Sequence, residues 1–281
     1  MHRMFAERAN DRGGMPVSVL GPFTGRRFIR WLLARGLLRP VRASSLLPTW
    51  QKPFNFFVTH ENVPQRRMLA QFQIGFWIKE CHQPTCYRFP NWMLHLDYAD
   101  RDSPSGYQRF GVRLSVETLR QPLSRANATR PRKRRAVIVT SHLRRPRKML
   151  YEVVDKVIGC EGYGRAFNRA VPTKEDVLRD YEFNLCPENG LGSGYVTEKI
   201  PEAFHAGCVP ITWCHPQALA RDFNPAAVIN LHGLSKSKMV DELTQILWSG
   251  ERFDSLLSEP LLLNKPSLDG NREFVLRARI S

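Results

Sequence analysis

The C-terminal half of the chain contains two clusters of residues that are suited to binding an anion. The first cluster follows the apolar run Ala136 to Thr140, which predicts a buried strand. It consists of four cations that precede an expected helix: Arg144, Arg145, Arg147 and Lys148. Cations at a helix N-terminus oppose the helix dipole, and α/β folds bind phosphates where a parallel strand leads into such a helix. We therefore expect an anion at this turn, the alternative being a solvated basic loop.

The second cluster is the glycine-rich segment 189–199, whose glycines are Gly190, Gly192 and Gly194. Glycines at this density let the backbone approach a ligand closely. We expect Thr197 to cap a helix, which brings Tyr195, Glu198 and Lys199 to the mouth of that helix. Glu198 suits ribose or sugar hydroxyls, and Lys199 suits a phosphate. As pure structure, Glu198 would be a carboxylate favoured by the helix dipole and Lys199 a surface cation.

A third candidate, Glu61, directly follows the apolar run Phe54 to Thr59, which predicts another strand. A carboxylate at the end of a strand in one domain can face a ligand that a second domain holds across a cleft. Carboxylates act as general bases when burial raises their pKa. Glu61 is therefore a candidate general base, and a structural carboxylate in a loop is the alternative. His60 and His142 have no partner for a catalytic triad, and we interpret both as structural or supporting residues.

Residues that ligate metals do not form a complete set in the sequence. Cys81, His82 and Cys86 could hold a metal or contribute to a disulfide, but no second ligand pair stands at a matching spacing. We therefore predict no metal site, and we expect the six cysteines to be buried free thiols. Walker loops, dinucleotide-binding glycine motifs, zinc-protease motifs and serine-hydrolase elbows are absent from the sequence.

The composition predicts a folded protein with an anionic partner. Hydrophobic residues make up 42% of the 281 residues, as in soluble globular proteins. The net charge of +16 favours nucleic acid, an anionic membrane or glycan, or a phosphorylated substrate as the partner. No run is long and apolar enough for a membrane-spanning helix, and Met1 to Gly14 lacks the apolar core of a signal peptide. Arg26 to Arg39 predicts a helix that packs in the core or lies on a membrane surface.

Alternating strand and helix patterns predict an α/β protein with parallel sheets. Further strands are expected at Gln73 to Trp77, Val209 to Trp213 and Ala227 to Leu231, and helices at Leu150 to Ile158 and Met239 to Leu247. A break in composition before residue 136 favours a linker between two domains. The expected organisation is a basic N-terminal arm (1–45), a first domain (46–120), a basic linker (121–135), a second domain (136–262) and a C-terminal tail (263–281).

Several consecutive motifs resemble those of the α-1,3/4-fucosyltransferase family, glycosyltransferase family 10. The motifs are Tyr181 to Gly190, Gly194 to Lys199, Ala206 to Ile211 and Arg221 to Pro225. Upstream, Phe57 to Pro64 and Ile74 to Phe76 are similar to the acceptor-side strand and loop of the family. The resemblance implies a fold of the GT-B type, in which two Rossmann-like domains face a central cleft and the second domain holds most of the donor, GDP-fucose.

The resemblance also implies roles for particular residues. The donor-binding residues would be Arg147, Asn189, Tyr195, Glu198 and Lys199. Arg147 and Lys199 would contact the phosphates, and Glu198 the ribose or the fucose. Glu61 is similar to the proposed general base of the family.

The implied reaction is an inverting transfer of L-fucose from GDP-β-L-fucose to a GlcNAc or glucose unit of a lacto- or lactosamine-type glycan, with an α-1,3 or α-1,4 linkage. No cofactor is strictly required, and Mn²⁺ or Mg²⁺ would only stimulate the reaction. The alternatives are a related glycosyltransferase with another nucleotide-sugar donor and a non-catalytic basic protein that binds anionic lipid or nucleic acid. The intact donor-binding set favours an enzyme without a nucleic-acid partner.

The expected location follows from the charge of the chain. We expect a bacterial cytoplasmic enzyme in peripheral contact with the anionic inner membrane, through the basic run Arg130 to Arg135. The alternative is a Golgi enzyme whose membrane anchor is missing from this chain.

Overall fold

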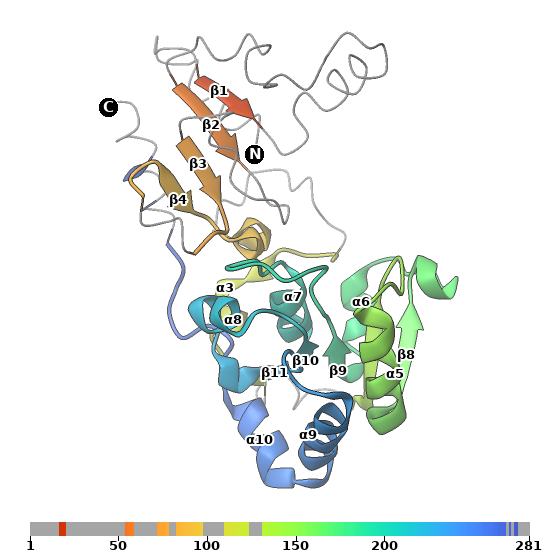
Figure 1. Ribbon diagram of the computed structural model, residues 1–281. Coiled ribbons are helices and arrows are strands. Elements are labelled where there is room, and N and C mark those ends of the chain that lie inside the picture. Colours follow the sequence, from red (N-terminus) through yellow and green to blue (C-terminus); the bar gives the residue numbers. More distant parts are fainter. Residues whose placement is uncertain are drawn as a thin grey trace, which may run out of the picture. The chain divides into compact units, whose positions relative to one another are not determined.

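The computed structural model describes residues 17–20, 54–58, 72–78, 83–97, 110–123, 131–267, 270 and 273–274 (Figure 1). The chain divides into two compact units. The first comprises Met1–Pro90 together with Ser267–Ser281, and the second comprises Asn91–Pro266. Each unit contains a parallel sheet of its own. No helix in the described ranges has the length and apolar character needed to cross a membrane.

The first unit has a four-stranded sheet. Its strands, in order across the sheet, are β1 Val17–Leu20, β2 Phe54–Val58, β3 Phe72–Gly75 and β4 Cys86–Arg88. All of β3 is buried, as expected for a parallel strand covered on both faces. Phe274 packs edge-on against Phe72 and stacks on Tyr87, with ring centroids 6.0 and 5.4 Å apart. A residue close to the C-terminus of the chain therefore helps to form the core of the first unit.

The second unit has a five-stranded sheet in which all neighbouring strands are parallel. Its strands are β7 Lys133–Val139, β8 Cys160–Tyr163, β9 Tyr181–Leu185, β10 Val209–Thr212 and β11 Ile229–Asn230. Their order across the sheet is β11-β10-β9-β7-β8. Within this sheet, β7 is the first strand in sequence. The next strand, β8, lies on one side of it, and the chain then crosses to β9 on the other side. A sheet of this order has its topological switch point between the first and third strands, at their carboxyl ends, and that point is a preferred ligand site.

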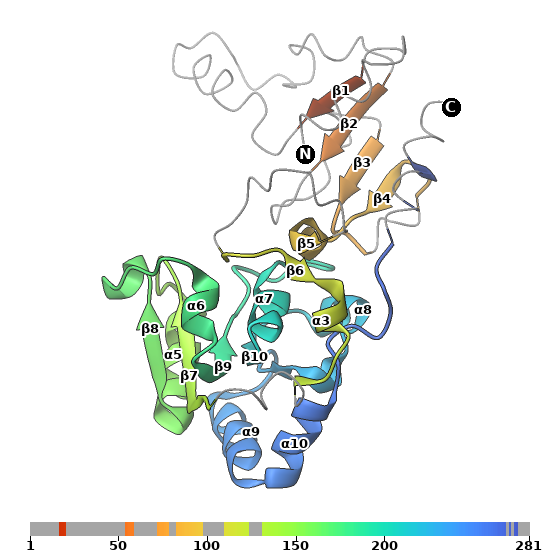
Figure 2. The ribbon, with the colours of Figure 1, turned by 180° about the vertical axis from the view of Figure 1, so that it is seen from behind.

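Helices cover both faces of this sheet. α5 Arg147–Ile158 and α9 Lys236–Trp248 pack against each other on one face. α6 Lys174–Leu178 and α7 Lys199–His205 belong to connections that run the opposite way across the sheet, so right-handed crossovers place them on the other face (Figure 2). The unit also contains α8 Pro216–Asp222, α10 Gly250–Ser258 and the 3₁₀ turns η5 Arg165–Phe167 and η6 Pro225–Ala227.

The expected helices at Leu150 to Ile158 and Met239 to Leu247 are confirmed as α5 and α9. The apolar residues of α5, spaced three and four apart, are buried: Leu150, Val153, Val154 and Ile158. The start of α9 is capped by Ser235, whose side chain accepts a hydrogen bond from the backbone N–H of Lys238. Both helices therefore form where the hydrophobic spacing and the end signals of the sequence agree.

Residues that precede the five-stranded sheet in sequence pack against α7. They form the 3₁₀ helix η4 Asn91–His95, the parallel pair β5 Leu96–Asp97 and β6 Leu114–Ser115, and α3 Val116–Leu119. Both β6 and α3 contact α7, and Leu114 and Leu119 are almost fully buried. The start of the second unit is therefore built from residues that lie before its main sheet.

The α/β class with parallel sheets is confirmed, but several expected boundaries differ. The compact units divide at Pro90, and β6 and α3, which precede the main sheet of the second unit in sequence, contact α7 of that unit. Lys133–Arg135, expected in a linker, begin strand β7, where their side chains are exposed and therefore lack a hydrophobic signal. The run Ala227 to Leu231 yields only the short strand β11, since the preceding residues form η6. The expected helix at Arg26 to Arg39 lies outside the described residues, and β1 is a strand that the sequence pattern did not predict.

Candidate active site

Arg147 lies at the start of α5, beside the carboxyl end of β7, and is only 8% exposed. Its Nη1 donates a hydrogen bond to Oγ1 of Thr140 at 3.2 Å and contacts the His142 ring at 3.2 Å. Its Nη2 donates to Oδ1 of Asn189, which follows β9. Arg147 and Asn189, both expected to bind the donor, therefore meet across the switch point between β7 and β9.

The partners of Arg147 leave its charge available to a ligand. Thr140 and Asn189 are neutral, and among the described residues no carboxylate lies within ion-pair distance of the guanidinium. Burial lowers the pKa of Arg147, while the more distant charges of Glu188 and Tyr195 raise it. A partly buried cation with neutral partners is stabilised when an anion binds to it. We expected an anion at this basic turn, and the group best placed to bind it is the guanidinium of Arg147.

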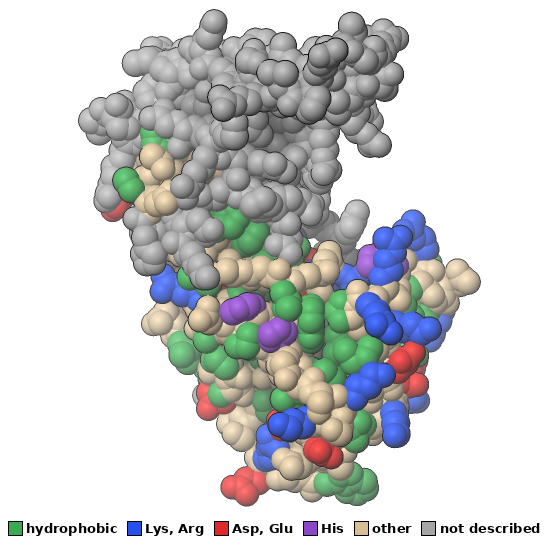
Figure 3. Space-filling view, in the orientation of Figure 1, with side chains coloured by type: hydrophobic (Ala, Val, Ile, Leu, Met, Phe, Trp, Pro, Cys, Tyr) green, Lys and Arg blue, Asp and Glu red, His purple; other side chains and the backbone are tan. Residues whose placement is uncertain are grey.

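His142 orients Arg147 and belongs to a positively charged surface. Local desolvation lowers its pKa, and so do the charges of Arg147, Arg144 and Arg165. The ring is therefore neutral at pH 7 and can accept a hydrogen bond from the guanidinium. Figure 3 shows Lys and Arg side chains gathered over the side of the second unit that α5 and β8 form. The exposed cations there include Arg144, Arg145, Lys148 and Arg165.

The glycine-rich segment is anchored at both ends. At its start, the backbone N–H of Glu188 donates to the carbonyl of Trp213 at 3.3 Å, which continues the pairing between β9 and β10. Near its end, Gly194 has φ +90°, a conformation that favours glycine. The N–H of Tyr195 donates to the Gly192 carbonyl at 3.0 Å, and Tyr195 is buried. The segment therefore makes a defined turn that places Tyr195 within electrostatic reach of Arg147 and Lys199.

Thr197 does not cap α7 as expected. α7 begins at Lys199, its N-cap position is Glu198, and no side chain caps that end. Thr197 instead donates to the fully buried Glu188, through its N–H at 2.8 Å and its hydroxyl at 2.9 Å. The reason is that a buried carboxylate requires hydrogen-bond donors, and this requirement outweighs a helix cap worth about 1 kcal/mol.

Lys199 completes this buried network. Its Nζ lies 2.9 Å from Oε2 of Glu188 and 2.6 Å from Oγ1 of Thr197. Burial lowers the pKa of Lys199, but Glu188 and Glu198 raise it more, so the group stays charged. An ammonium has three donors, and these contacts occupy two of them. One donor therefore remains for a ligand at the mouth of α7, where the sequence placed Lys199.

Glu198 is the more open carboxylate of the site, with a side chain 27% exposed. Its Oε1 lies 3.8 Å from Nζ of Lys199 and its Oε2 lies 4.0 Å from Nε2 of His95. Burial raises its pKa, but the charges of Lys199, Lys174 and His95 lower it to about 2. Glu198 is therefore a permanent hydrogen-bond acceptor, suited to the hydroxyls of a ribose or a sugar.

The expected general base and part of the possible metal-ligand set lie outside the described residues. Glu61, His60, Cys81 and His82 lie outside the described residues, so the general base stays a prediction. The described cysteines, Cys86, Cys160, Cys186, Cys208 and Cys214, are buried free thiols. The described ranges contain no group of three or more His, Cys, Asp or Glu side chains that could hold a metal ion.

Residues 129–256 match the family model for the C-terminal region of glycosyltransferase family 10 (fucosyltransferase). The chain carries a family 10 domain. This confirms the resemblance that the motifs between Tyr181 and Pro225 indicated. The family 10 domain includes the whole five-stranded sheet, with its switch point at Arg147 and Asn189.

A curated relative is similar in sequence, and solved structures are similar in fold. The α-(1,3)-fucosyltransferase FucT of Helicobacter pylori is 34% identical over 133 residues, which are 46% of this chain and 27% of that protein. The match thus spans about a quarter of the relative's length. A crystal structure of an α1,3-fucosyltransferase superposes with a TM-score of 0.67 at 20% identity, covering 97% of this chain and 92% of that one. Another, with GDP-fucose, gives a TM-score of 0.63 at 20% identity, covering 95% and 91%. The GT-B fold class is confirmed.

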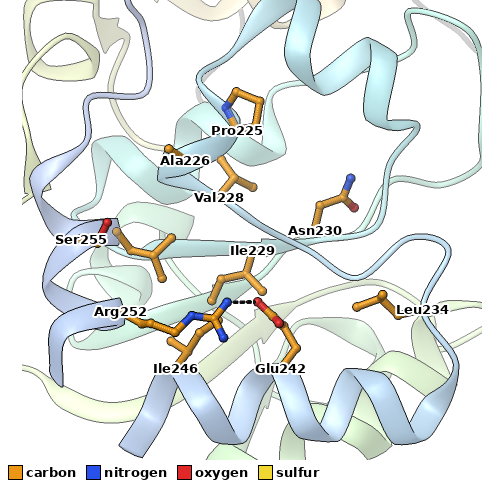
Figure 4. A pocket seen from close by; sticks show the side chains of 11 residues that line it. Pro225, Ala226, Val228, Ile229, Asn230, Leu234, Glu242, Ile246, Arg252 and Ser255 are labelled. Atoms are coloured by element: carbon orange, nitrogen blue, oxygen red, sulfur yellow. Dashed lines mark hydrogen bonds and ion pairs between the residues drawn. The ribbon is translucent and has the colours of Figure 1, made fainter. Parts of the chain in front are cut away.

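A pocket of about 480 Å³ lies elsewhere in the family 10 domain, between η6, β11, α9 and α10 (Figure 4). Apolar side chains such as Ile229 and Ile246 line it, and an ion pair of 2.6 Å joins Glu242 and Arg252 at its wall. None of the predicted donor-binding residues lines this pocket. The candidate active site is therefore the polar edge at the switch point.

Sequence reasoning missed three contributors to the site. Glu188 stands inside the matched motif and has a signal, since a carboxylate beside Asn189 in a glycine-rich segment is a candidate partner for Lys199. His142 was interpreted as a structural or supporting residue, but its contact with the Arg147 guanidinium was not expected. His95 had no signal at all, because only the tertiary fold brings η4 to Glu198.

Proposed function

We propose that the protein is an inverting fucosyltransferase. It transfers L-fucose from GDP-β-L-fucose to a hydroxyl of a GlcNAc or glucose unit in a lacto- or lactosamine-type glycan, with an α-1,3 or α-1,4 linkage. The observation that carries this proposal is the buried guanidinium of Arg147, whose hydrogen-bond partners among the described residues are neutral and which lies at the switch point of a family 10 domain. The activities of the Helicobacter pylori relative and of the solved fucosyltransferase structures support fucose as the transferred sugar.

The donor binds along the carboxyl edge of the sheet. Arg147 and the remaining donor of Lys199 hold the diphosphate, and Asn189 keeps the guanidinium in place. Glu198 accepts hydrogen bonds from hydroxyls of the ribose or the fucose. The buried Tyr195 supports this edge from the glycine-rich segment. The exposed cations around His142 attract the anionic donor before it binds.

The transfer is a single displacement. The acceptor hydroxyl oxygen attacks the anomeric carbon of fucose while the bond from that carbon to the β-phosphate oxygen of GDP breaks. The proton of the hydroxyl passes to the base, which we propose is Glu61, and the electron pair of the broken bond leaves with GDP. Attack from the face opposite the leaving group converts the β-linked donor into an α-linked product. Arg147 stabilises the charge that develops on GDP.

No cofactor is needed for this chemistry, because protein cations supply the charge that a metal supplies elsewhere. Mn²⁺ or Mg²⁺ could still stimulate the reaction by binding the phosphates from solution. Activity that persists in excess chelator, at more than half of its value with metal, is the expected result.

The proposal also includes contact with an anionic membrane at a cytoplasmic location. The basic run was expected to supply this contact, yet several of its members bind within the protein. Arg132 donates to the carbonyls of Tyr181 and Ala206, Lys133 pairs with Glu161, and Arg134 donates to the Leu247 carbonyl. The exposed cations near His142 are therefore the better candidates for any electrostatic contact with a membrane.

The direct test is transfer of labelled fucose from GDP-fucose to a panel of lacto- and lactosamine-type acceptors, with linkage analysis of the product. Formation of an α-1,3 or α-1,4 product supports the proposal. Binding and hydrolysis of another nucleotide sugar, such as a UDP-sugar or GDP-mannose, in place of GDP-fucose would favour a related glycosyltransferase. Absence of binding to every nucleotide sugar, with retention on anionic vesicles, would favour the non-catalytic protein.

The base has a separate test. In Glu61→Gln, we expect donor binding to be unchanged and the transfer rate to fall about 100-fold or more, as for loss of a general base. Calorimetry with GDP measures the first quantity and initial rates measure the second. An unchanged rate with unchanged binding would remove Glu61 from the mechanism without affecting the donor site.

A further inference from the structure

We propose that Trp213, His215 and His232 form a carbohydrate-binding platform beside the donor site, on which the apolar face of a pyranose packs. The sequence motifs assign no ligand to these side chains. The proposal rests on the proposed function, since it adds a sugar subsite to the transfer site. The pyranose is either the fucose of the donor or a sugar of the acceptor, and binding and rate measurements distinguish the two sources.

The platform lies at the carboxyl edge of the five-stranded sheet, where α/β folds bind ligands. Trp213 directly follows β10, and His232 follows β11 after one intervening residue. The carbonyl of Trp213 accepts the hydrogen bond from the N–H of Glu188 at 3.3 Å. Because Glu188 also pairs with Lys199, the platform is directly connected to the residues that we propose for donor binding.

The three rings adjoin one another at the surface. Trp213 and His232 meet edge to face, with ring centroids 5.4 Å apart and an interplanar angle of 63°. The rings of His215 and His232 lie closer to parallel, at 28°, with centroids 6.2 Å apart. All three residues are partly exposed, and Figure 3 shows histidine side chains at the surface of the second unit with apolar side chains around them. A ligand can therefore reach rings that the fold does not bury completely.

Asn230 holds together the two loops that carry the rings. Its Oδ1 accepts hydrogen bonds from the N–H groups of Cys214 and His232, at 3.3 and 3.2 Å. Its Nδ2 donates to the carbonyl of Cys214 at 3.1 Å. Cys214 is fully buried and stands between Trp213 and His215, so these bonds fix the backbone beside all three rings. A platform that is ordered before binding loses less conformational entropy when the ligand arrives.

The platform suits a sugar because it combines ring faces with hydrogen-bonding edges. A pyranose has a face of C–H groups, and fucose adds a methyl group. Such groups pack on the negative faces of aromatic rings. Burial lowers the pKa of His232, and so does the charge of His215. The His232 ring is therefore neutral at pH 7, so it can pack against an apolar surface or form a hydrogen bond with a hydroxyl.

A purine base and a metal ion suit the platform less well than a sugar. The edge of guanine carries N–H donors that need acceptors. However, the Asn230 amide is used within the protein, and Nδ1 of His215 accepts the N–H of Gln217 at 3.3 Å. A metal site typically needs at least three protein ligands, and no group of three His, Cys, Asp or Glu side chains that could hold a metal occurs in the described ranges.

Removal of the Trp213 ring tests the proposal. Trp213→Leu keeps an apolar side chain without the ring. Calorimetry measures the dissociation constants of GDP and of GDP-fucose, and initial rates measure the KM for N-acetyllactosamine. If the fucose of the donor packs on the platform, GDP-fucose should bind about tenfold more weakly, and if a sugar of the acceptor does, the KM should rise about tenfold. The affinity for GDP should stay within twofold in both cases.

Matched variants separate the loss of the ring from a loss of folding. Trp213→Phe keeps a ring and should restore most of the affinity for the sugar. Trp248→Leu removes a tryptophan that is 85% exposed at the end of α9, and it should change none of the three quantities. If circular dichroism shows that Trp213→Leu does not fold, His232→Ala takes its place, with the same expected difference between GDP and the sugar ligand.

Two results would overturn the platform. Equal weakening of GDP and GDP-fucose would mean that the rings contact the base, and three unchanged quantities would mean that they contact no ligand. Failure of the wild-type protein to bind any guanine nucleotide would instead overturn the proposed function. In that case, saturation-transfer NMR with free L-fucose and N-acetyllactosamine decides the platform: sugar signals that the wild type shows and Trp213→Leu loses would support it, and any other result would overturn it.

Discussion

Arg147 and Lys199 are cations of one site, yet their surroundings differ in charge. Lys199 is paired at 2.9 Å with the fully buried Glu188, so its charge is compensated inside the protein. Arg147 is bound by Thr140 and Asn189, which are neutral. The Lys199 region therefore builds and stabilises the edge of the sheet, and the Arg147 region supplies most of the uncompensated charge. The comparison shows that one basic residue of a site can mainly stabilise the fold while another mainly binds the ligand.

The largest expected effect is on the Arg147 side. Arg147→Ala should weaken GDP binding about 1,000-fold, because hydrogen bonds to a charged phosphate contribute about 1.5–3 kcal/mol each and a guanidinium can donate two of them. The free energy of unfolding should change little, since the residue removed is a cation without a carboxylate partner among the described residues. Calorimetry and urea unfolding measure the two quantities. Arg147→Lys, which keeps the charge but not the planar fork, should give an intermediate affinity. GDP affinity equal to that of the wild type in Arg147→Ala would end the comparison.

The next effect is on the Lys199 side and appears in stability. Glu188→Gln removes the carboxylate that compensates Lys199 and should lower the free energy of unfolding by about 3 kcal/mol. Urea unfolding measures it. The matched control is Glu161→Gln, which affects the more exposed pair with Lys133 and should cost about 1 kcal/mol or less. Equal losses in the two variants would mean that Glu188 has no special structural role.

The smallest expected effect is the acid sensitivity of Glu198. Its pKa of about 2 in the folded protein lies below the ordinary value of 4.5, so its contribution to stability is complete above pH 4.5 and is lost as the pH falls toward 2. Between pH 5 and pH 3 this amounts to about 2 kcal/mol. In Glu198→Gln, the loss of stability over that interval should be smaller by this amount, as measured by urea unfolding at both pH values. An identical acid profile in wild type and variant would contradict the low pKa.

Much of the fold was predictable because the signals are local. The spacing of Leu150, Val153, Val154 and Ile158 predicts α5, and the apolar runs predict β2, β3, β7 and β10 within a few residues. Strand β9 was not predicted as a strand although it begins the matched motif, and β8 has the weakly apolar sequence Cys-Glu-Gly-Tyr. The burial of β8 results from its pairing with β7, and a local sequence pattern carries no information about that pairing.

The candidate site divides in the same way. Residue types and motifs indicated Arg147, Asn189, Tyr195, Glu198 and Lys199, and the structure brings Arg147 to Asn189 and Lys199 to Glu198. The expectation that Thr197 caps α7 was wrong. A capping residue can be recognised from the local sequence, but the hydrogen bond that Thr197 donates to the buried Glu188 depends on the tertiary fold. Glu61 stays a prediction that the test of transfer rate can decide.

The sequence by itself predicted an anionic ligand and indicated the resemblance to family 10, because charge, glycine spacing and motif order can be read along the chain. Only the tertiary structure decided which charges compensate one another. The switch point joins Arg147 to Asn189 from strands that are adjacent in space and separated by β8 in sequence. The packing of η4 brings His95 within 4.0 Å of Glu198, across about a hundred residues of chain. Electrostatic interactions depend on distance in space, and charges that are far apart in the sequence come close only when the protein has folded.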